Sequence, residues 1–110
     1  MTDQETAQKF AAILQDAVLE IDPTINFRWQ RMFGGAGYYA DDRMFAAWFR
    51  GRSFALKLSS EDRDALLQMD GAQPATKNYV EVPQAFLEDI PLLAEWAAKS
   101  IAFVKSLPQS

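Results

Sequence analysis

The sequence of 110 residues contains no cysteine and no histidine. Without cysteine the chain has no disulfides and no thiolate metal site. Without histidine it lacks the side chain that most often acts as an acid or base near neutral pH, which is also the commonest metal ligand. Only carboxylates, lysine, tyrosine, serine and threonine remain for catalysis. We therefore expect a protein that is not an enzyme, with no catalytic residues, no metal site and no cofactor.

Long apolar runs are also missing. No stretch approaches the roughly 18 to 20 apolar residues that span a bilayer. The N-terminal MTDQETAQKF is polar and acidic, whereas a secretory signal is basic and then apolar. Hydrophobic residues make up 49% and charged residues 24%, which is close to globular averages, and the length suits one domain. We expect a single cytoplasmic domain over residues 1–110 that makes no contact with membranes.

The net charge of −4 is unevenly distributed along the chain. Residues 28–57 carry six basic side chains against two acids, which gives +4. Residues 1–27 carry one base against five acids and residues 58–110 carry four against eight, so each flank stands at −4. The basic middle is either a docking face for an anionic partner or, as the more ordinary interpretation, a basic sheet neutralised by acidic helices.

Two long helices are predicted at the ends of the chain. Thr2 and Glu5 have the spacing of a capping box, apolar residues then recur every three or four positions, and Pro23 ends this helix. Asp89 is the predicted N-cap of the second helix. Its buried stripe is predicted to comprise Leu93, Trp96, Ala97, Ile101, Val104 and Leu107.

A shorter helix is predicted after Ser59, which can cap it. Leu66, Leu67 and Met69 are expected to pack inward, and Gly71 ends the segment. Acidic residues cluster at two predicted helix starts, where the helix dipole favours them, so they need no catalytic or metal-binding role. These clusters are Glu61, Asp62 and Asp64, and Glu88 with Asp89.

Strands are predicted over most of residues 26–58 and again near residue 80. Residues 53–58 alternate apolar with small or polar side chains, which is typical of a half-buried strand. Asp41-Asp42 and Arg50-Gly51 are predicted tight turns, and residues 72–77 a loop. The predicted strands cover residues 27–33, 37–40, 43–49, 53–58 and 78–82.

The order of these elements predicts an α+β fold, with an antiparallel sheet of four to five strands packed with the N- and C-terminal helices. The strands contain more aromatic surface than two amphipathic helices need, so one face of the sheet can stay open. A homodimer through the sheet or its edge is a natural outlet for that surface. The aromatic residues in question are Tyr38, Tyr39, Phe45, Trp48 and Phe49.

The glycines at Gly34, Gly35 and Gly37 admit two interpretations. A phosphate cradle needs glycines between a strand and the N-terminus of a helix. Here the glycines lead into Tyr38 and Tyr39 and another strand, with no following Lys-Ser or Lys-Thr pair. We therefore expect them to form a structural turn or bulge with positive φ.

Basic and aromatic side chains of the same segment form the candidate binding site for a partner or an anion. Guanidinium groups suit carboxylate and phosphate geometry. Basic residues mixed with aromatic ones also resemble binders of single-stranded nucleic acid, but the chain as a whole is acidic, so direct nucleic-acid binding is disfavoured. The candidate residues are Arg28, Arg31, Tyr39, Arg43, Trp48 and Arg52.

Several short motifs also follow one another in a characteristic order. They are Arg31-Met32-Phe33-Gly34-Gly35, Gly37-Tyr38-Tyr39, Asp42-Arg43-Met44-Phe45-Ala46, Ala55-Leu56-Lys57-Leu58, Val82-Pro83 with Leu87-Glu88-Asp89, and Leu93-x-x-Trp96.

This ordered series closely resembles the TfoX N-terminal domain family, named after the regulator of DNA-transformation competence also called Sxy. The resemblance covers roughly residues 28–107. It implies an α-β-α domain like that of secretion chaperones and a regulatory, protein-binding role, with regulators of the family acting at promoters as partners of the cAMP receptor protein. We expect a stand-alone version of this domain, without the C-terminal helical domain of the full-length regulators.

Two functions remain open from the sequence. The first is a small regulatory module that binds a protein partner and forms a homodimer. The alternative is a domain that responds to a small ligand or nucleotide, bound by Arg28, Arg31 and the aromatic face of the sheet.

Overall fold

The computed structural model describes residues 2–32, 34–76 and 78–108. Their fold is α+β, as predicted, with an antiparallel sheet in the order β1-β2-β3-β4-β6-β5. The strands are β1 (Phe27–Met32), β2 (Gly35–Ala40), β3 (Arg43–Phe49), β4 (Phe54–Lys57), β5 (Gln73–Pro74) and β6 (Tyr79–Glu81). The helices are α1 (Asp3–Ile21), α2 (Ser60–Leu67), the 3-10 helix η1 (Gln84–Glu88) and α3 (Ile90–Ser106).

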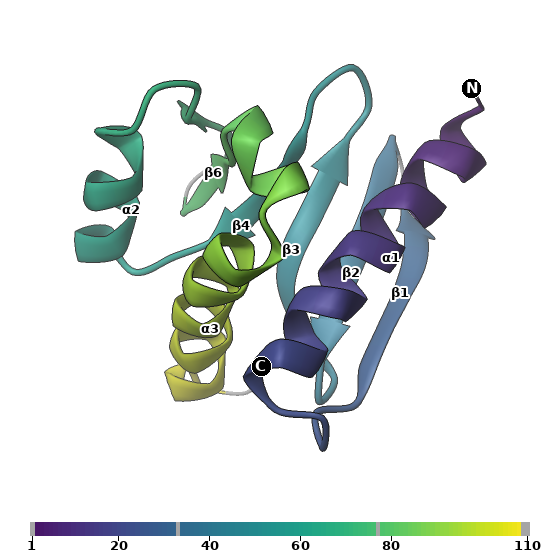
Figure 1. The fold of residues 1–110 in the computed structure, drawn as a ribbon, viewed down its shortest axis with the longest axis horizontal. Coiled ribbons are helices and arrows are strands. Elements are labelled where there is room, and N and C mark those ends of the chain that lie inside the picture. Colours follow the sequence, from purple (N-terminus) through teal and green to yellow (C-terminus); the bar gives the residue numbers. More distant parts are fainter. Residues whose placement is uncertain (1, 33, 77, 109–110) are drawn as a thin grey trace.

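Both long helices lie on the same face of the sheet. Figure 1 shows α1 and α3 side by side in front of the strands, with α2 beyond β6 at the left of the view. The α-β-α order along the chain therefore produces two layers in space, one of helices and one of strands.

The predicted helix starts are confirmed. The Thr2 hydroxyl accepts a hydrogen bond from the Glu5 amide at 3.1 Å, and the Glu5 carboxylate accepts one from the Thr2 amide at 2.9 Å, which completes the capping box. Hydrogen bonding of the Glu5 carboxylate to the Thr2 backbone and side chain lowers the pKa of Glu5. Ser59 caps α2 and Asp89 caps α3, each by accepting from a backbone amide in the first turn.

The core fills the space between the helices and the sheet. Apolar side chains of α1 and α3 meet the inward-facing residues of β2, β3 and β4. Two polar groups in this layer have partners: the Tyr38 hydroxyl donates to the Ala7 carbonyl at 3.0 Å, and the Ser100 hydroxyl donates to the Phe45 carbonyl at 2.7 Å. The largest fully buried side chains are Tyr38, Phe45, Phe54, Phe86, Leu14, Leu56, Leu58, Leu66 and Leu93.

The sheet has more strands than the four to five predicted, because part of the predicted loop at 72–77 forms β5. This strand is only two residues long and pairs with β6, so no alternation of side chains could reveal it. The first predicted strand, 27–33, is confirmed to Met32, and Phe33 lies outside the described residues.

The glycine prediction is correct for Gly34 and wrong for Gly35 and Gly37. Gly34 has a φ of +75° in the connection between β1 and β2, whereas the other two belong to β2 and are absent from the positive-φ positions. A side chain at Gly35 is excluded by the neighbouring strand, since its Cβ would lie 1.8 Å from the Trp48 carbonyl oxygen. Close approach of strands, and not turn geometry, explains glycine at this position.

Two predictions about apolar surface are also corrected. Tyr38, Phe45 and Trp48 lie in the core beneath the helices and supply no spare aromatic surface. Met69 does not pack inward, because α2 ends at Leu67 and leaves its side chain 36% exposed.

Candidate functional site

The sheet face opposite α1 and α3, called the outer face below, is the candidate docking surface. Strand register places alternate residues of each strand on it, and within the described residues no helix packs over it. Its members are Arg28, Gln30, Met32, Gly37, Tyr39, Met44, Ala47, Phe49, Ala55, Lys57, Tyr79 and Glu81.

Gly37 is buried on the outer face beneath the side chains of three neighbouring residues. A Cβ at this position would lie 2.6 Å from Met32 Sδ, 2.8 Å from Met44 Sδ and 3.4 Å from a ring atom of Tyr39. Three large side chains therefore occupy the space that a side chain at position 37 would need. Methionine is flexible and polarisable, so this part of the surface can adapt to the shape of a partner.

A second apolar group continues the outer face toward β6. Ala47 and Ala55 are small and buried, and the rings of Phe49 and Tyr79 meet edge to face beside them with centroids 6.2 Å apart. Because Ala47 and Ala55 are small, the larger side chains of Phe49 and Tyr79 can cover this part of the sheet. The partly exposed apolar side chains of the outer face therefore lie on β1, β2 and β3, whereas Ala55 of β4 and Tyr79 of β6 are buried.

Arg28 is the one predicted arginine that joins an aromatic residue on this face. Its guanidinium lies 4.1 Å from the centroid of the Tyr39 ring, which is a cation–π contact. Its Nε also donates to the Asp42 carboxylate at 3.1 Å. Arg28 and Tyr39 are paired across β1 and β2, so this part of the candidate site follows directly from strand register.

The other candidate residues are dispersed. Arg31 donates to the Gln4 side chain at the start of α1, and Arg52 forms an ion pair of 2.6 Å with Glu81. Arg43 donates from Nη1 to the carbonyls of Val104 and Leu107, both at 2.9 Å, which caps the end of α3. Trp48 is 4% exposed and its indole donates to the Arg52 carbonyl. Together these positions form no single anion-binding cluster.

Ion pairs connect the basic middle of the chain with its acidic flanks. Arg50 lies 2.7 Å from Asp3 of α1, and Arg52 contacts Glu81 of β6. In the reverse direction, Lys105 of α3 lies 2.6 Å from Asp41. These contacts support neutralisation within the molecule, the more ordinary of the two interpretations of the charge distribution.

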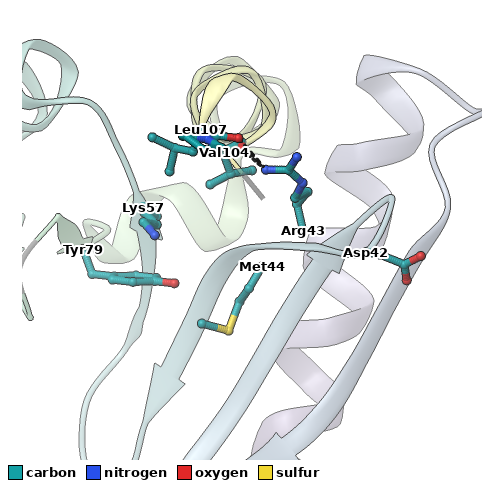
Figure 2. Close-up of a pocket in the computed structure, with 8 residues that line it drawn as sticks. Asp42, Arg43, Met44, Lys57, Tyr79, Val104 and Leu107 are labelled. Atoms are coloured by element: carbon teal, nitrogen blue, oxygen red, sulfur yellow. Dashed lines mark hydrogen bonds between the residues drawn. The ribbon is translucent and has the colours of Figure 1, made fainter. Parts of the chain in front are cut away.

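A pocket of about 330 Å³ opens where the sheet is incomplete. β4 pairs with Ala46–Trp48, so the first residues of β3 have no partner strand on that side, and the end of α3 passes over the gap. Figure 2 shows Tyr79 and Lys57 at the left of the view, Met44 near its centre, and Arg43 reaching toward α3. The pocket is lined by Asp42, Arg43, Met44, Lys57, Tyr79, Val104, Leu107 and Pro108.

The Tyr79 hydroxyl has an unusual environment in this pocket. The residue is 8% exposed, and its hydroxyl oxygen has no hydrogen-bond partner among the described residues. Burial raises the pKa of Tyr79 to about 12. The Lys57 ammonium lies 6.0 Å from the centroid of the Tyr79 ring.

Neither a metal centre nor a membrane span is found in the part of the chain that the structure describes. Residues 2–32, 34–76 and 78–108 contain no group of three or more acidic side chains placed to hold a metal ion. None of their helices is long and apolar enough to cross a bilayer.

Met32, Met44, Lys57 and Tyr79 were not selected as site residues by the sequence reasoning. Lys57 alternates with the buried Leu56 and Leu58, which already indicates that it points away from the core. Its pairing with Tyr79 depends on which strands are neighbours, and β4 and β6 are separated in sequence by α2 and β5. Only the topology brings these two residues together.

Comparison with protein families gives a match to the TfoX N-terminal domain over residues 21–104, which is more than half of the chain. The match contains β1 to β6, α2 and most of α3, and therefore both the outer face and most of the pocket lining. Comparisons with curated proteins and with solved structures give no match.

Proposed function

Because the chain belongs to the TfoX N-terminal domain family, we propose that it is a regulatory protein-interaction module of the cytoplasm. Its docking surface is the outer face, and the occupant of that face is a second copy of the chain. The family is named after a regulator of competence, which supports a regulatory role. The observation that carries the proposal is the placement of both long helices on one face of the sheet, which leaves the apolar group around Gly37 without a covering element.

The dimensions of the outer face suit a dimer. The molecule measures 34 × 32 × 28 Å, and Figure 1 looks down the shortest axis onto the broad layer of helices and strands. A standard interface buries roughly 800 Å² on each partner. A face of this breadth can supply that area. A two-fold axis would place the same apolar centre on both copies, which is the isologous contact expected of a homodimer.

Charge also favours contact through this face. The cations Arg28 and Lys57 on the outer face are accompanied by the carboxylates of Asp42 and Glu81, so two outer faces meet with little net repulsion. On the opposite side, α1 carries four acids against one base. Two helical faces would therefore bring like charges together.

Light scattering after size exclusion tests the proposal with a matched pair of variants. Met32 is 36% exposed on the outer face, and Leu19 is 53% exposed on α1, so we expect the fold to tolerate glutamate at both positions. We expect a dimer for the native chain and for Leu19→Glu, and a folded monomer for Met32→Glu. A monomeric native chain, or a dimer that Leu19→Glu and not Met32→Glu dissociates, would overturn the proposal.

A further inference from the structure

The pocket beside Tyr79 contains hydrogen-bond donors that the fold does not use. The Tyr79 hydroxyl is buried and has no partner in the described part of the chain. A buried hydroxyl without an acceptor is unfavourable, so such a group is normally satisfied by protein, water or ligand. Figure 2 shows this hydroxyl directed toward Met44, another residue of the pocket lining. An occupant that accepts a hydrogen bond here would satisfy it.

The charges around the same space are positive. The Lys57 ammonium has no ion pair within the described residues, and Arg43 adds a second cation whose Nη1 is fixed by the end of α3. Asp42 is the one acid in the lining. It is paired with Arg28, and Figure 2 shows its carboxylate directed away from the pocket.

Two backbone acceptors beside the pocket are already committed. The carbonyls of Val104 and Leu107 accept from Arg43 Nη1. The pocket therefore offers donors and positive charge, which selects an occupant that is an acceptor and an anion.

The rest of the lining is apolar and limits the size of the occupant. Met44, Val104, Leu107 and Pro108 form the remaining walls. A volume of about 330 Å³ is at the lower end of the range for small-molecule sites. One uncommitted ammonium balances one negative charge, so a monoanion fits better than a phosphate dianion.

From these observations we propose that the pocket binds a small monocarboxylate with an apolar body, its carboxylate lying between the Lys57 ammonium and the Tyr79 hydroxyl. The site is separate from the anion site predicted around Arg28 and Arg31. It shares Met44, Lys57 and Tyr79 with the outer face, so its test is also run on a variant that does not dimerise. The proposed ligand site is thus formed by residues of β3, β4 and β6 and by the C-terminal end of α3.

Titration of the isotopically labelled protein by NMR tests the site with simple probes. Benzoate and butyrate supply a carboxylate on an apolar body, benzamide supplies the ring without the charge, and inorganic phosphate supplies charge without the body. We expect saturable shifts of the Lys57, Tyr79 and Leu107 amides with benzoate or butyrate. Benzamide and phosphate should produce none.

Three variants make the test specific. Lys57→Gln and Tyr79→Phe should each weaken carboxylate binding about tenfold, since each removes one charge-assisted hydrogen bond. Lys9→Gln, an exposed lysine of α1, should bind like the native chain. Because the Tyr79 hydroxyl bonds to nothing in the described protein, Tyr79→Phe should keep its melting temperature while losing affinity.

Three outcomes would overturn the inference: no saturable binding of either carboxylate, equal binding of benzamide, or unchanged affinity in both pocket variants. The titration is repeated on Met32→Glu, so that occupancy of the pocket is scored apart from oligomeric state. Failure of the dimer is then read from light scattering, and failure of the pocket from the titration.

Discussion

Gly34 and Gly35 are adjacent in the chain and are required for different reasons. Gly34 has a φ of +75°, and a Cβ there would meet no atom within 4 Å. Gly35 has no positive φ, but its Cβ would lie 1.8 Å from the Trp48 carbonyl oxygen and 2.9 Å from the carbonyl carbon. Backbone conformation limits the first position, whereas contact with β3 limits the second.

This difference predicts unequal effects of alanine at the two positions. Gly34→Ala should lower the free energy of unfolding by about 1 kcal/mol, the cost of a left-handed conformation for a residue with a Cβ. Gly35→Ala must displace backbone of β3, so we expect a loss of about 3 kcal/mol or more, or failure to fold. Urea denaturation of both variants measures the contrast. Similar losses in the two variants would contradict the geometry described for β2.

Buried tyrosines should make the protein sensitive to alkaline pH. Burial raises the pKa of Tyr79 to about 12 and also raises that of Tyr38. Above pH 10 a tyrosine ionises in the unfolded chain while these two stay protonated in the folded protein. Unfolding then releases protons, so rising pH favours the unfolded state.

We therefore expect the free energy of unfolding to fall above pH 10, by roughly 1 kcal/mol per pH unit for each buried tyrosine. Tyr79→Phe should make this dependence shallower between pH 10 and 12, because one of the two groups is removed. Denaturation at several pH values gives both slopes. Identical slopes for the native chain and Tyr79→Phe would show that Tyr79 titrates normally.

At the scale of elements, the turn between β2 and β3 connects three parts of the fold. Asp41 and Asp42 have φ values of 48° and 67°, which is the pattern of a type I′ hairpin. The Asp41 carboxylate accepts from Lys105 of α3 and from the Asn26 amide before β1, and these bonds lower its pKa. Asp42 contacts only the exposed Arg28 among the described ion pairs.

Glycine should therefore have opposite effects at the two turn positions. Asp42→Gly relieves a positive φ and gives up one exposed ion pair, so the melting temperature should stay the same or rise. Asp41→Gly gives up the contacts with α3 and with the connection before β1, so its melting temperature should fall. Thermal unfolding of the two variants distinguishes these outcomes. A lower melting temperature for Asp42→Gly than for Asp41→Gly would contradict the role assigned to Asp41.

Elements with strong local signals could be predicted from the sequence. The capping box at Thr2, the cap at Asp89 and the alternation in residues 53–58 each depend on a few neighbouring residues, and the structure confirms all three. β5 could not be predicted, because its two residues form a strand only through pairing with β6. The role of Gly35 was also inaccessible, since it depends on the distance to another strand.

At the scale of the whole molecule, the candidate site was only partly predictable. Arg28 and Tyr39 meet because their strands are sequential neighbours. Arg31, Arg43 and Arg52 instead bond to α1, α3 and β6, partners that are distant in sequence and are set by the packing of the helices. The four arginines that lie close together in the sequence therefore contact four different parts of the fold.

The two layers of the fold determine which surface is available to a partner. α1 and α3 share one face of the sheet and bury the larger aromatic side chains of β2 and β3. The opposite face retains Met32, Met44 and Tyr39 over Gly37. The proposal that a second copy binds there depends on this asymmetry and on the acidic charge of α1.

Intermolecular paramagnetic relaxation tests this central claim most directly. Because the chain has no cysteine, Gln30→Cys places a single spin label on the outer face. The labelled chain is mixed with native chain carrying ¹⁵N, so that broadening reports only contacts between copies. We predict broadening of outer-face amides such as those of Tyr39 and Ala47, with α1 amides unaffected. Broadening confined to α1, or none at all at a concentration where light scattering shows a dimer, would contradict the account.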